Sequence, residues 1–294
     1  MELKGLIKSF YKNILIVFIS FITACGGNSG SPAAKRIDSI TFTDANLATC
    51  VTTASTGKTY IYQLLTLSCT GKTLSGLSGL EKLVSLQTLY LNFNNITDIS
   101  ALSSLRDLNT LSIYNNSISD ISALSGLSKL TNLTAYNNSI SDVSPLSGLT
   151  ELTVLYLGAN NISDISPLTN LTKLYYLDLG SNVVSDITSL STLINITTLS
   201  LSGNSIVDVS PLATMTKMND LYLYNNNIGG QGVGKVDSLV TMNAATKIGL
   251  QNNINMSCAE LTTLLGTLAS PPVNVDSDYS NTDLVNPGTN CTNT

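Results

Sequence analysis

The sequence predicts an α/β solenoid, in which short turns of chain stack so that a concave parallel β-sheet forms one side and 3₁₀ or irregular turns form the convex side. The first observation is a repeat of 22 residues from about Leu86 to Leu223, because a period of this length indicates a repeat architecture. The second is the apolar pattern inside each repeat. Apolar residues alternate over Leu89–Leu91, as in a strand with one buried face. They then recur every three residues, at Ile99, Leu102, Leu105 and Leu108.

Columns of one residue type appear when the repeats are placed in register. No single unit can bury its apolar side alone, so neighbouring units must stack into one core. The strand leucine occurs at Leu89, Leu111, Leu133, Leu155, Leu177, Leu199 and Leu221. An asparagine occurs at Asn94, Asn116, Asn138, Asn160, Asn182, Asn204 and Asn226. An aspartate occurs at Asp98, Asp120, Asp142, Asp164, Asp186 and Asp208.

The unit L-x-L-x-x-N-x-I-x-D-I-x-x-L-x-x-L resembles the short bacterial leucine-rich repeat of the internalin type, and the resemblance covers roughly half of the chain. It implies a leucine-rich-repeat solenoid. It also implies protein–protein recognition through the concave side of the sheet.

Five segments are expected along the chain. They are an export signal over residues 1–24, a lipidated cysteine and flexible tether over 25–36, an N-terminal cap over 37–66, the repeats over 67–246, and a last rung with a C-terminal cap over 247–294.

The first segment has the pattern of an export signal. Three lysines precede the apolar run Ile14–Ile22, which is too short for a membrane span of about 20 residues. Residues Ile22–Cys25 resemble a bacterial lipobox, which implies cleavage before Cys25 and transfer of diacylglycerol to its thiol. The alternative is an ordinary signal peptide followed by an incidental cysteine. Because Gly26 follows the cysteine, the resemblance implies an envelope protein that is lipid-anchored in the outer membrane or displayed at the cell surface, provided that the host has two membranes.

Four further cysteines support an exported chain, since an even number of cysteines is typical of disulfide-bonded proteins. Cys50 and Cys69 precede the repeats, Cys258 and Cys291 follow them, and a disulfide requires Cα atoms within about 7 Å. We therefore expect the pairs Cys50–Cys69 and Cys258–Cys291, each joining a cap to the stack. Cys69 lies 22 residues before Leu91, so it should be buried in the first rung. A zinc site is the alternative, but C-x-x-C spacing and histidine are lacking, so we expect no metal.

Tyrosines gather on one predicted surface. Side chains alternate faces along a strand, so the register directs seven of the twelve tyrosines outward onto the concave sheet. Tyrosine offers a rigid amphipathic contact surface and is enriched at interfaces, so we expect a protein or glycan partner to bind here. The alternative is that these rings merely suit a pleated surface. The expected binding residues are Tyr90, Phe93, Tyr114, Tyr136, Tyr156, Tyr176, Asp178, Tyr222 and Tyr224.

The polar columns are interpreted as scaffold. A buried asparagine amide can bond the backbone of its own turn and the next one. The aspartates should lie at the solvated edge and accept bonds from turn N–H groups, because carboxylates about 5 Å apart repel one another. Calcium bridging is the alternative for that column. Hydroxyl caps of the convex turns are expected at Ser100, Ser122, Ser144, Ser166 and Ser210.

The repeat breaks once, after Ile228. The stretch Gly229–Lys235 matches G-x-x-x-x-G-K, but Val236 replaces the hydroxyl residue that would hold magnesium, so an insertion is the simpler interpretation. Strand signals resume at Ile248, which lies 27 residues after Leu221. A capping helix is expected over residues 258–268.

Composition excludes several activities. The chain has no histidine, which rules out histidine-based acid–base and triad chemistry. The formal net charge of −5 disfavours a nucleic acid partner. Asp178 and Asp220 lie two rungs apart and form no catalytic pair. We therefore expect a non-enzymatic binding lipoprotein without a cofactor; the alternatives are a purely structural envelope protein and an enzyme acting on envelope glycans.

Overall fold

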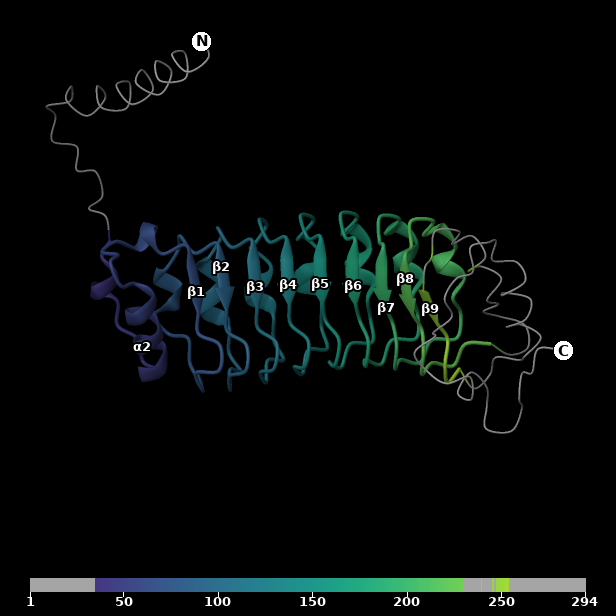
Figure 1. Cartoon of the computed structure of the whole chain (residues 1–294), viewed down its shortest axis with the longest axis horizontal. Coiled ribbons are helices and arrows are strands. Elements are labelled where there is room, and N and C mark those ends of the chain that lie inside the picture. Colours follow the sequence, from purple (N-terminus) through teal and green to yellow (C-terminus); the bar gives the residue numbers. More distant parts are fainter. Residues whose placement is uncertain (1–34, 230–238, 240–244, 246, 254–294) are drawn as a thin grey trace, which may run out of the picture. The chain divides into compact units, whose positions relative to one another are not determined.

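The computed structural model describes residues 35–229, 239, 245 and 247–253 (Figure 1). The chain divides into two units, Met1–Lys35 and Arg36–Thr294, and every element below belongs to the second. The export signal, the lipidated Cys25 with its tether, the Cys258–Cys291 pair, the helix expected over 258–268 and residues 230–236 lie outside the described residues. Within the described part, no helix has the length and apolarity needed to cross a membrane.

The described residues contain nine short parallel strands, which form one sheet in sequence order (Figure 1). They are β1 (Thr66–Ser68), β2 (Thr88–Tyr90), β3 (Thr110–Ser112), β4 (Asn132–Thr134), β5 (Val154–Tyr156), β6 (Tyr176–Asp178), β7 (Thr198–Ser200), β8 (Asp220–Tyr222) and β9 (Lys247–Gly249). The register begins with Leu67 opposite Leu89 and ends with Leu221 opposite Ile248. The predicted solenoid is therefore confirmed, including the strand that follows the insertion.

From β1 to β8 the chain returns from one strand to the next through 3₁₀ turns, as the three-residue apolar spacing predicts. These turns are η3 (Leu80–Lys82), η4 (Ser100–Ser104), η5 (Ser122–Leu124), η6 (Ser144–Leu146), η7 (Ser166–Asn170), η8 (Thr188–Thr192) and η9 (Ser210–Thr214). Two further 3₁₀ turns, η1 (Ile37–Ser39) and η2 (Ile61–Gln63), precede β1.

The prediction that serine hydroxyls cap these turns is wrong. In η4, Ser100 is the first residue of the turn, and the N-cap residue Ile99 makes no side-chain bond. The carboxylate of Asp98 satisfies the free donor instead, because its Oδ1 accepts the N–H of Ser100 at 2.8 Å. The first N–H of a 3₁₀ turn has no partner within the turn. In η4 that N–H belongs to Ser100 itself, so an acceptor must come from a residue before the turn, and Asp98 is close enough to supply it.

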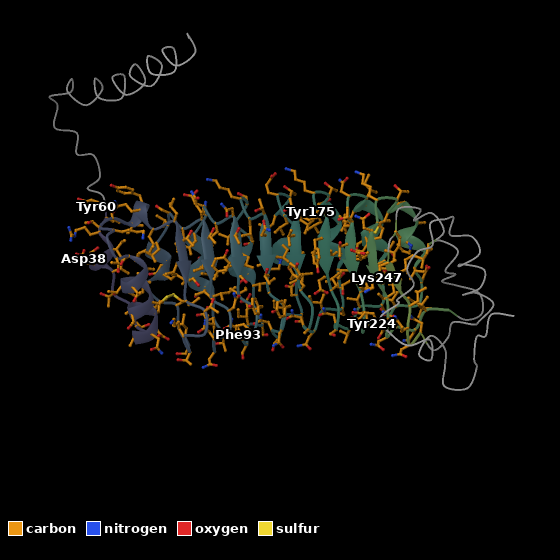
Figure 2. All side chains as sticks on the ribbon, viewed as in Figure 1. Asp38, Tyr60, Phe93, Tyr175, Tyr224 and Lys247 are labelled. Atoms are coloured by element: carbon orange, nitrogen blue, oxygen red, sulfur yellow. A yellow bond between two sulfur atoms is a disulfide. The ribbon has the colours of Figure 1, made fainter. Side chains whose placement is uncertain are left out.

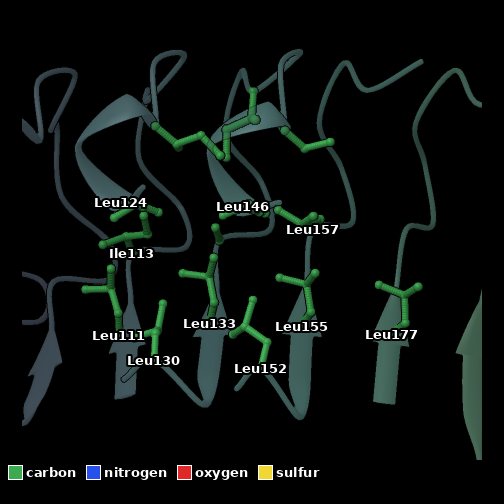
Figure 3. Packing of buried hydrophobic residues seen from close by; sticks show 14 of the residues in the cluster. Leu111, Ile113, Leu124, Leu130, Leu133, Leu146, Leu152, Leu155, Leu157 and Leu177 are labelled. Carbon is green, nitrogen blue, oxygen red and sulfur yellow. The ribbon is translucent and has the colours of Figure 1, made fainter. Parts of the chain in front are cut away.

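The apolar columns form a continuous core (Figure 3). Leu111, Leu133 and Leu155 point inward from β3, β4 and β5, and Leu124 and Leu146 come from the returning turns; all five are fully buried. Full burial of a leucine side chain contributes roughly 1.5–3 kcal/mol. Each added turn therefore extends the core and stabilises the turns beside it.

Buried asparagine side chains form the hydrogen bonds that buried backbone N–H and carbonyl groups need, which leucine side chains cannot form. Nδ2 of Asn160 donates to the carbonyls of Leu157 and Gly158 in its own turn, at 2.9 and 3.2 Å, and to that of Ala135 at 3.1 Å. Its Oδ1 accepts the N–H of Ile140 at 3.0 Å. The scaffold role is confirmed, but the second turn that is bonded is the preceding one rather than the next. The reason is that the side-chain amide of Asn160 lies close to the N–H of Ile140 and the carbonyl of Ala135, and both groups belong to the preceding turn.

The N-terminal cap contains helix α2 (Ala45–Ala54), which the sequence analysis did not predict. Asp44 begins the helix, since its Oδ1 accepts the N–H groups of Asn46 and Leu47 at 2.9 and 3.0 Å. Its Oδ2 accepts the N–H of Ser75 at 2.9 Å. Burial opposes the charge, yet these N–H donors hold the pKa of Asp44 below its ordinary value. One carboxylate therefore caps the helix and joins it to the stack.

A disulfide also joins α2 to the stack, as predicted. Cys50 in the helix is bonded to Cys69, which follows β1, and the two Cα atoms lie 5.8 Å apart. Cys69 is fully buried, as expected for an inward position of the first rung.

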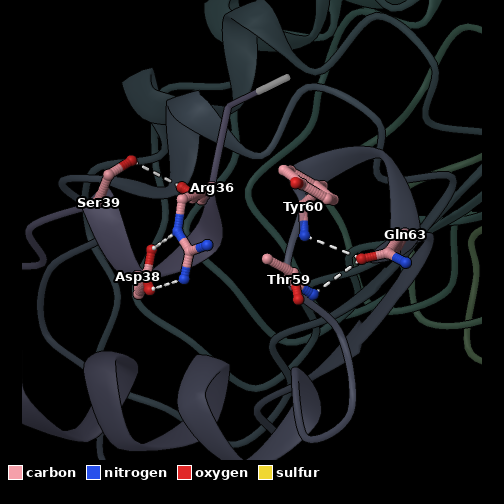
Figure 4. Close-up of polar contacts among 6 residues, drawn as sticks. All are labelled: Arg36, Asp38, Ser39, Thr59, Tyr60 and Gln63. Atoms are coloured by element: carbon pink, nitrogen blue, oxygen red, sulfur yellow. Dashed lines mark hydrogen bonds and ion pairs between the residues drawn. The ribbon is translucent and has the colours of Figure 1, made fainter. Parts of the chain in front are cut away.

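Polar contacts order the segment around the cap (Figure 4). The Arg36 guanidinium pairs with the carboxylate of Asp38. Oε1 of Gln63 accepts the N–H groups of Thr59 and Tyr60 at 2.8 and 2.9 Å. A backbone bridge links Arg36 to Tyr60, so the start of the folded body is fixed to the turn before β1.

Candidate functional site

The sheet directs the predicted binding residues to its outward side. The central residue of each strand is buried, and the outer positions are exposed or half-buried, as in β6. The exceptions are Ser112 of β3, Val154 of β5 and Gly249 of β9, which are buried. In Figure 2, Phe93 and Tyr224, which follow their strands, lie along one edge, whereas Tyr175, which precedes β6, lies along the other. We define the tyrosine face by the residues Tyr90, Phe93, Tyr114, Tyr136, Tyr156, Tyr176, Asp178, Tyr222 and Tyr224.

Three aromatic rings of the tyrosine face form one cluster over the ends of β2 to β4. The rings of Tyr114 and Tyr136 stack with centroids 4.4 Å apart and planes 12° apart. The ring of Phe93 meets Tyr114 edge to face at 5.0 Å. Burial and the neighbouring phenol of Tyr114 raise the pKa of Tyr136. The cluster is a neutral, rigid aromatic surface.

Phe93 adopts a backbone conformation that its side chain disfavours. Its φ is +55°, a left-handed value that is rare for bulky residues, and 53% of its surface is exposed. The sequence predicted Phe93 as a binding residue, and its left-handed backbone was not predicted. The signal was in the sequence, because most of the equivalent positions are asparagine or glycine, namely Asn115, Asn137, Gly203, Asn225 and Asn252, although Ala159 and Ser181 adopt the same conformation.

A second pair of rings lies on β5 and β6. The centroids of Tyr156 and Tyr176 are 4.5 Å apart, with planes tilted by 34°. Burial, then the phenol of Tyr156 and the charge of Asp178, raise the pKa of Tyr176 far above its ordinary value, so its phenol stays neutral. On β8, the Tyr222 ring lies under the Lys247 ammonium at 5.2 Å.

Not every outward position is accessible. Asn92 follows β2 on the outward side, but only 6% of its surface is exposed. Its Oδ1 accepts the hydroxyl of Ser112 at 2.7 Å and the N–H of Tyr114 at 3.2 Å. Strand alternation directs Asn92 outward and predicts that it is exposed, which is wrong: it is buried and supports the backbone and side chains below the aromatic cluster.

Asp178 is the acidic member of the tyrosine face. It lies on β6 between Tyr156 and Ser200 in the strand register, and its Oδ1 accepts the N–H of Gly180 at 2.9 Å. A side chain on Gly158 would approach Oδ2 to 3.0 Å. The carboxylate therefore leans over two glycines, an arrangement that the sequence analysis did not foresee.

The aspartate column lies at the solvated edge, as predicted. Backbone N–H bonds lower the pKa of Asp98, Asp120 and Asp164, and a hydroxyl bond from Thr188 is the main cause of the lowered pKa of Asp186. Each of these carboxylates accepts the backbone N–H two residues later in its own turn. Among the described residues, no group of three or more His, Cys, Asp or Glu side chains comes together that could hold a metal ion.

These features define a parallel-β solenoid with a varied, aromatic outward face, an architecture that is common among protein-interaction scaffolds. The sequence profile described as "Leucine Rich repeats (2 copies)" matches residues 84–126, 106–148, 128–170 and 150–192. No curated protein sequence matches significantly.

Solved structures extend this result beyond the profile matches. An internalin (inlF) from Listeria monocytogenes is similar at a TM-score of 0.71 and 36% identity, over 80% of this chain and 70% of that one. An internalin C2 from the same organism is similar at 0.67 and 35% identity, over 74% and 97% of the respective chains. The chain belongs to the leucine-rich-repeat family, with internalins among its structural neighbours.

A receptor from a plant has a similar fold. It is the leucine-rich-repeat ectodomain of the receptor kinase GASSHO1/SCHENGEN3 from Arabidopsis thaliana in complex with Casparian strip integrity factor 2. The TM-score is 0.55 at 26% identity, over 61% of this chain and 23% of that one.

Proposed function

We propose that this protein is a non-enzymatic lipoprotein of the bacterial cell envelope that captures a protein partner on its tyrosine face. The observation that carries the proposal is the contiguous cluster of Phe93, Tyr114 and Tyr136. Aromatic side chains bury large areas at low cost in conformational entropy, and they are enriched among the residues that dominate binding energy.

Cross-strand packing alone would explain the stacked tyrosines but not Phe93. A left-handed backbone costs a non-glycine residue about 1–2 kcal/mol. Asparagine or glycine fills most equivalent positions, the small residues Ala159 and Ser181 fill two others, and Phe93 is the bulky residue among them. An exposed phenylalanine there gains little burial in the free protein to offset that cost. A partner that covers the ring would supply the missing burial.

The envelope location rests on other residues. The lipobox-like sequence before Cys25 supports a lipid anchor, and residues 26–34 would serve as a tether. The Cys50–Cys69 disulfide supports an oxidising compartment outside the cytoplasm. The plant ectodomain, whose structure was solved in complex with Casparian strip integrity factor 2, supports capture of a protein rather than a glycan.

The binding proposal is tested by removing the rings. Full-length protein would be immobilised, and partners captured from envelope extracts would be identified by mass spectrometry and then purified for titration. We expect the double variant Tyr114→Ser and Tyr136→Ser to weaken the confirmed complex at least tenfold while the circular dichroism spectrum stays unchanged. The matched control is Tyr62→Ser with Tyr175→Ser, because these two rings are exposed but lie off the tyrosine face. Equal affinity of both variants would contradict the proposal.

The location is tested separately. Cys25→Ser should move the protein from the membrane fraction to the soluble fraction. Digestion of intact cells with a protease should then distinguish display at the cell surface from retention in the periplasm. Membrane association that is unchanged in Cys25→Ser would contradict the lipid anchor.

A further inference from the structure

A notch interrupts the tyrosine face between its two aromatic ends. In the column of positions two residues after the strands, Tyr114 and Tyr136 are followed by Gly158, Gly180 and Ser202 before Tyr224 restores an aromatic ring. Neighbouring strands lie about 4.8 Å apart, so the backbones of Tyr136 and Tyr224 are separated by about 19 Å. We define the notch by its floor, which consists of Gly158, Asp178, Gly180, Ser200 and Ser202.

Tyrosine rings surround this floor. Tyr136 lies beside Gly158, and Tyr222 lies beside Ser200 in the strand register. The Tyr156–Tyr176 pair borders the floor along β5 and β6. The notch is therefore a low, polar surface inside a frame of phenol rings.

The two glycines are needed to present the Asp178 carboxylate. A Cβ atom on Gly158 would lie 3.0 Å from Oδ2 of Asp178, and one on Gly180 would lie 3.2 Å from Oδ1 and 3.0 Å from the hydroxyl oxygens of Ser200 and Ser202. Any side chain at these positions would displace the carboxylate or cover it. The N–H of Gly180 fixes Oδ1 at 2.9 Å, so the group is held in one orientation.

The carboxylate has no cationic partner within the described structure. Asp178 takes part in none of the ion pairs Arg36–Asp38, Lys82–Glu81, Lys129–Asp107 and Lys173–Glu151. A single carboxylate does not make a divalent cation site, which requires several oxygen ligands. An organic cation with hydrogen-bond donors matches the notch better.

We propose that the notch receives an arginine side chain of the protein partner. The proposal rests on the proposed function and specifies its chemistry. A guanidinium can donate two N–H bonds to the Asp178 carboxylate while its planar face stacks on a tyrosine ring. A lysine ammonium is a point charge without that planar face. The opposite charges also make the contact selective, because a partner with an acidic residue at this position would be repelled.

The test uses a probe of defined chemistry. N-acetyl-arginine N-methylamide would be titrated into the full-length protein at low salt and followed by saturation-transfer NMR, with the uncharged citrulline analogue as its isosteric control. We expect a dissociation constant on the order of 1 mM for the arginine probe and at least fivefold weaker binding of the citrulline analogue.

Two variants locate the probe. Asp178→Asn keeps the shape of the side chain and an acceptor for Gly180, yet it should weaken the arginine probe at least fivefold. Gly158→Ala, which crowds the carboxylate, should also weaken it. Glu151→Gln removes one negative charge from the Lys173 pair at the edge of the stack and should leave binding unchanged. Unfolding midpoints of all variants would be measured to exclude misfolding.

Each result decides the matter. Equal binding of arginine and citrulline probes, or equal weakening by Asp178→Asn and Glu151→Gln, would overturn the arginine site. Preference for N-acetyl-lysine N-methylamide over the arginine probe would overturn it as well. If the site fails while the Tyr114 and Tyr136 substitutions still abolish partner binding, the proposed function stands without this contact. If the probe binds as expected but those substitutions have no effect, the proposed function fails at the aromatic cluster.

Discussion

The columns inside the solenoid and the columns on the tyrosine face follow opposite rules. The inward column keeps leucine from β1 to β8. One outward column consists of Ser68, Tyr90, Ser112, Thr134, Tyr156, Asp178, Ser200 and Tyr222. Each turn must fit the turn beside it, so the packed residues repeat, whereas the outward residues are free to differ. Variation within a single chain therefore marks the surface that is available for recognition.

Two polar columns show how burial decides which residue can repeat. Asn160 is 8% exposed and its neutral amide bonds the backbone of two turns. Asp164, in the same repeat, is exposed and carries a charge that water screens. Stacked carboxylates could not replace the buried amides, because their mutual repulsion grows as the dielectric constant falls.

The largest effect should come from breaking an inward column. We expect Asn160→Ala to lower the free energy of unfolding by about 4 kcal/mol. It leaves the buried N–H of Ile140 without its partner, at a cost of about 1–3 kcal/mol, and it removes the amide's bonds to the carbonyls of Ala135 and Leu157, at about 0.5–1.5 kcal/mol each. Urea denaturation measures this. The control is Asn195→Ala, which removes an exposed amide and should change stability by less than about 0.5 kcal/mol. Similar losses in both would show that the buried column is not special.

The N-terminal cap, where the columns begin, should show a smaller effect. We expect the double variant Cys50→Ala and Cys69→Ala to lose about 3 kcal/mol, as is typical for a disulfide. The loss should be local, so hydrogen exchange should speed up in α2 and β1 but not in β5 to β7. Faster exchange throughout the sheet would mean that the cap and the repeats unfold as one unit.

Asp44 should have a still smaller effect, and one that depends on pH. Asp44→Ala should cost about 1–2 kcal/mol at pH 7, as expected for loss of an N-cap. The pKa of Asp44 is lower in the folded state, so its contribution is complete above the unfolded-state pKa near 3.9 and is lost as pH falls through the folded-state value. The stability difference between wild type and variant, measured from pH 7 to pH 2, should therefore shrink only in acid. A constant difference would contradict the role of the charge.

The smallest effect on stability should come from the tyrosine face. We expect Phe93→Asn to change the free energy of unfolding by less than about 1 kcal/mol, because relief of the left-handed strain offsets the lost contact with Tyr114. Partner binding, measured by titration, should nevertheless fall. A large loss of stability would instead place Phe93 in the scaffold.

The sequence predicted the features that repetition enforces. The period specified the register from Leu67 to Leu221, and position alone paired Cys50 with Cys69. Features that depend on a single turn were missed. Helix α2 depends on Asp44, whose carboxylate accepts N–H groups both from the helix and from Ser75. This residue lies outside the repeats, so the periodic pattern does not predict its role. The notch depends on where the carboxylate of Asp178 points, and only three-dimensional packing against Gly158 determines that direction.

The pairing of β8 with β9 shows which features place a turn in the stack. Leu221 faces Ile248 across 27 residues of chain, where every earlier step uses 22, and Asn253 still bonds the carbonyl of Leu223 and the N–H of Ile228. The position of a turn in the stack thus depends on where its inward apolar residue packs and where its asparagine amide bonds, and not on its number of residues. For protein engineering, the interval between β8 and β9 is therefore the position to choose for inserting a reporter domain, because the register there already accepts a longer connection.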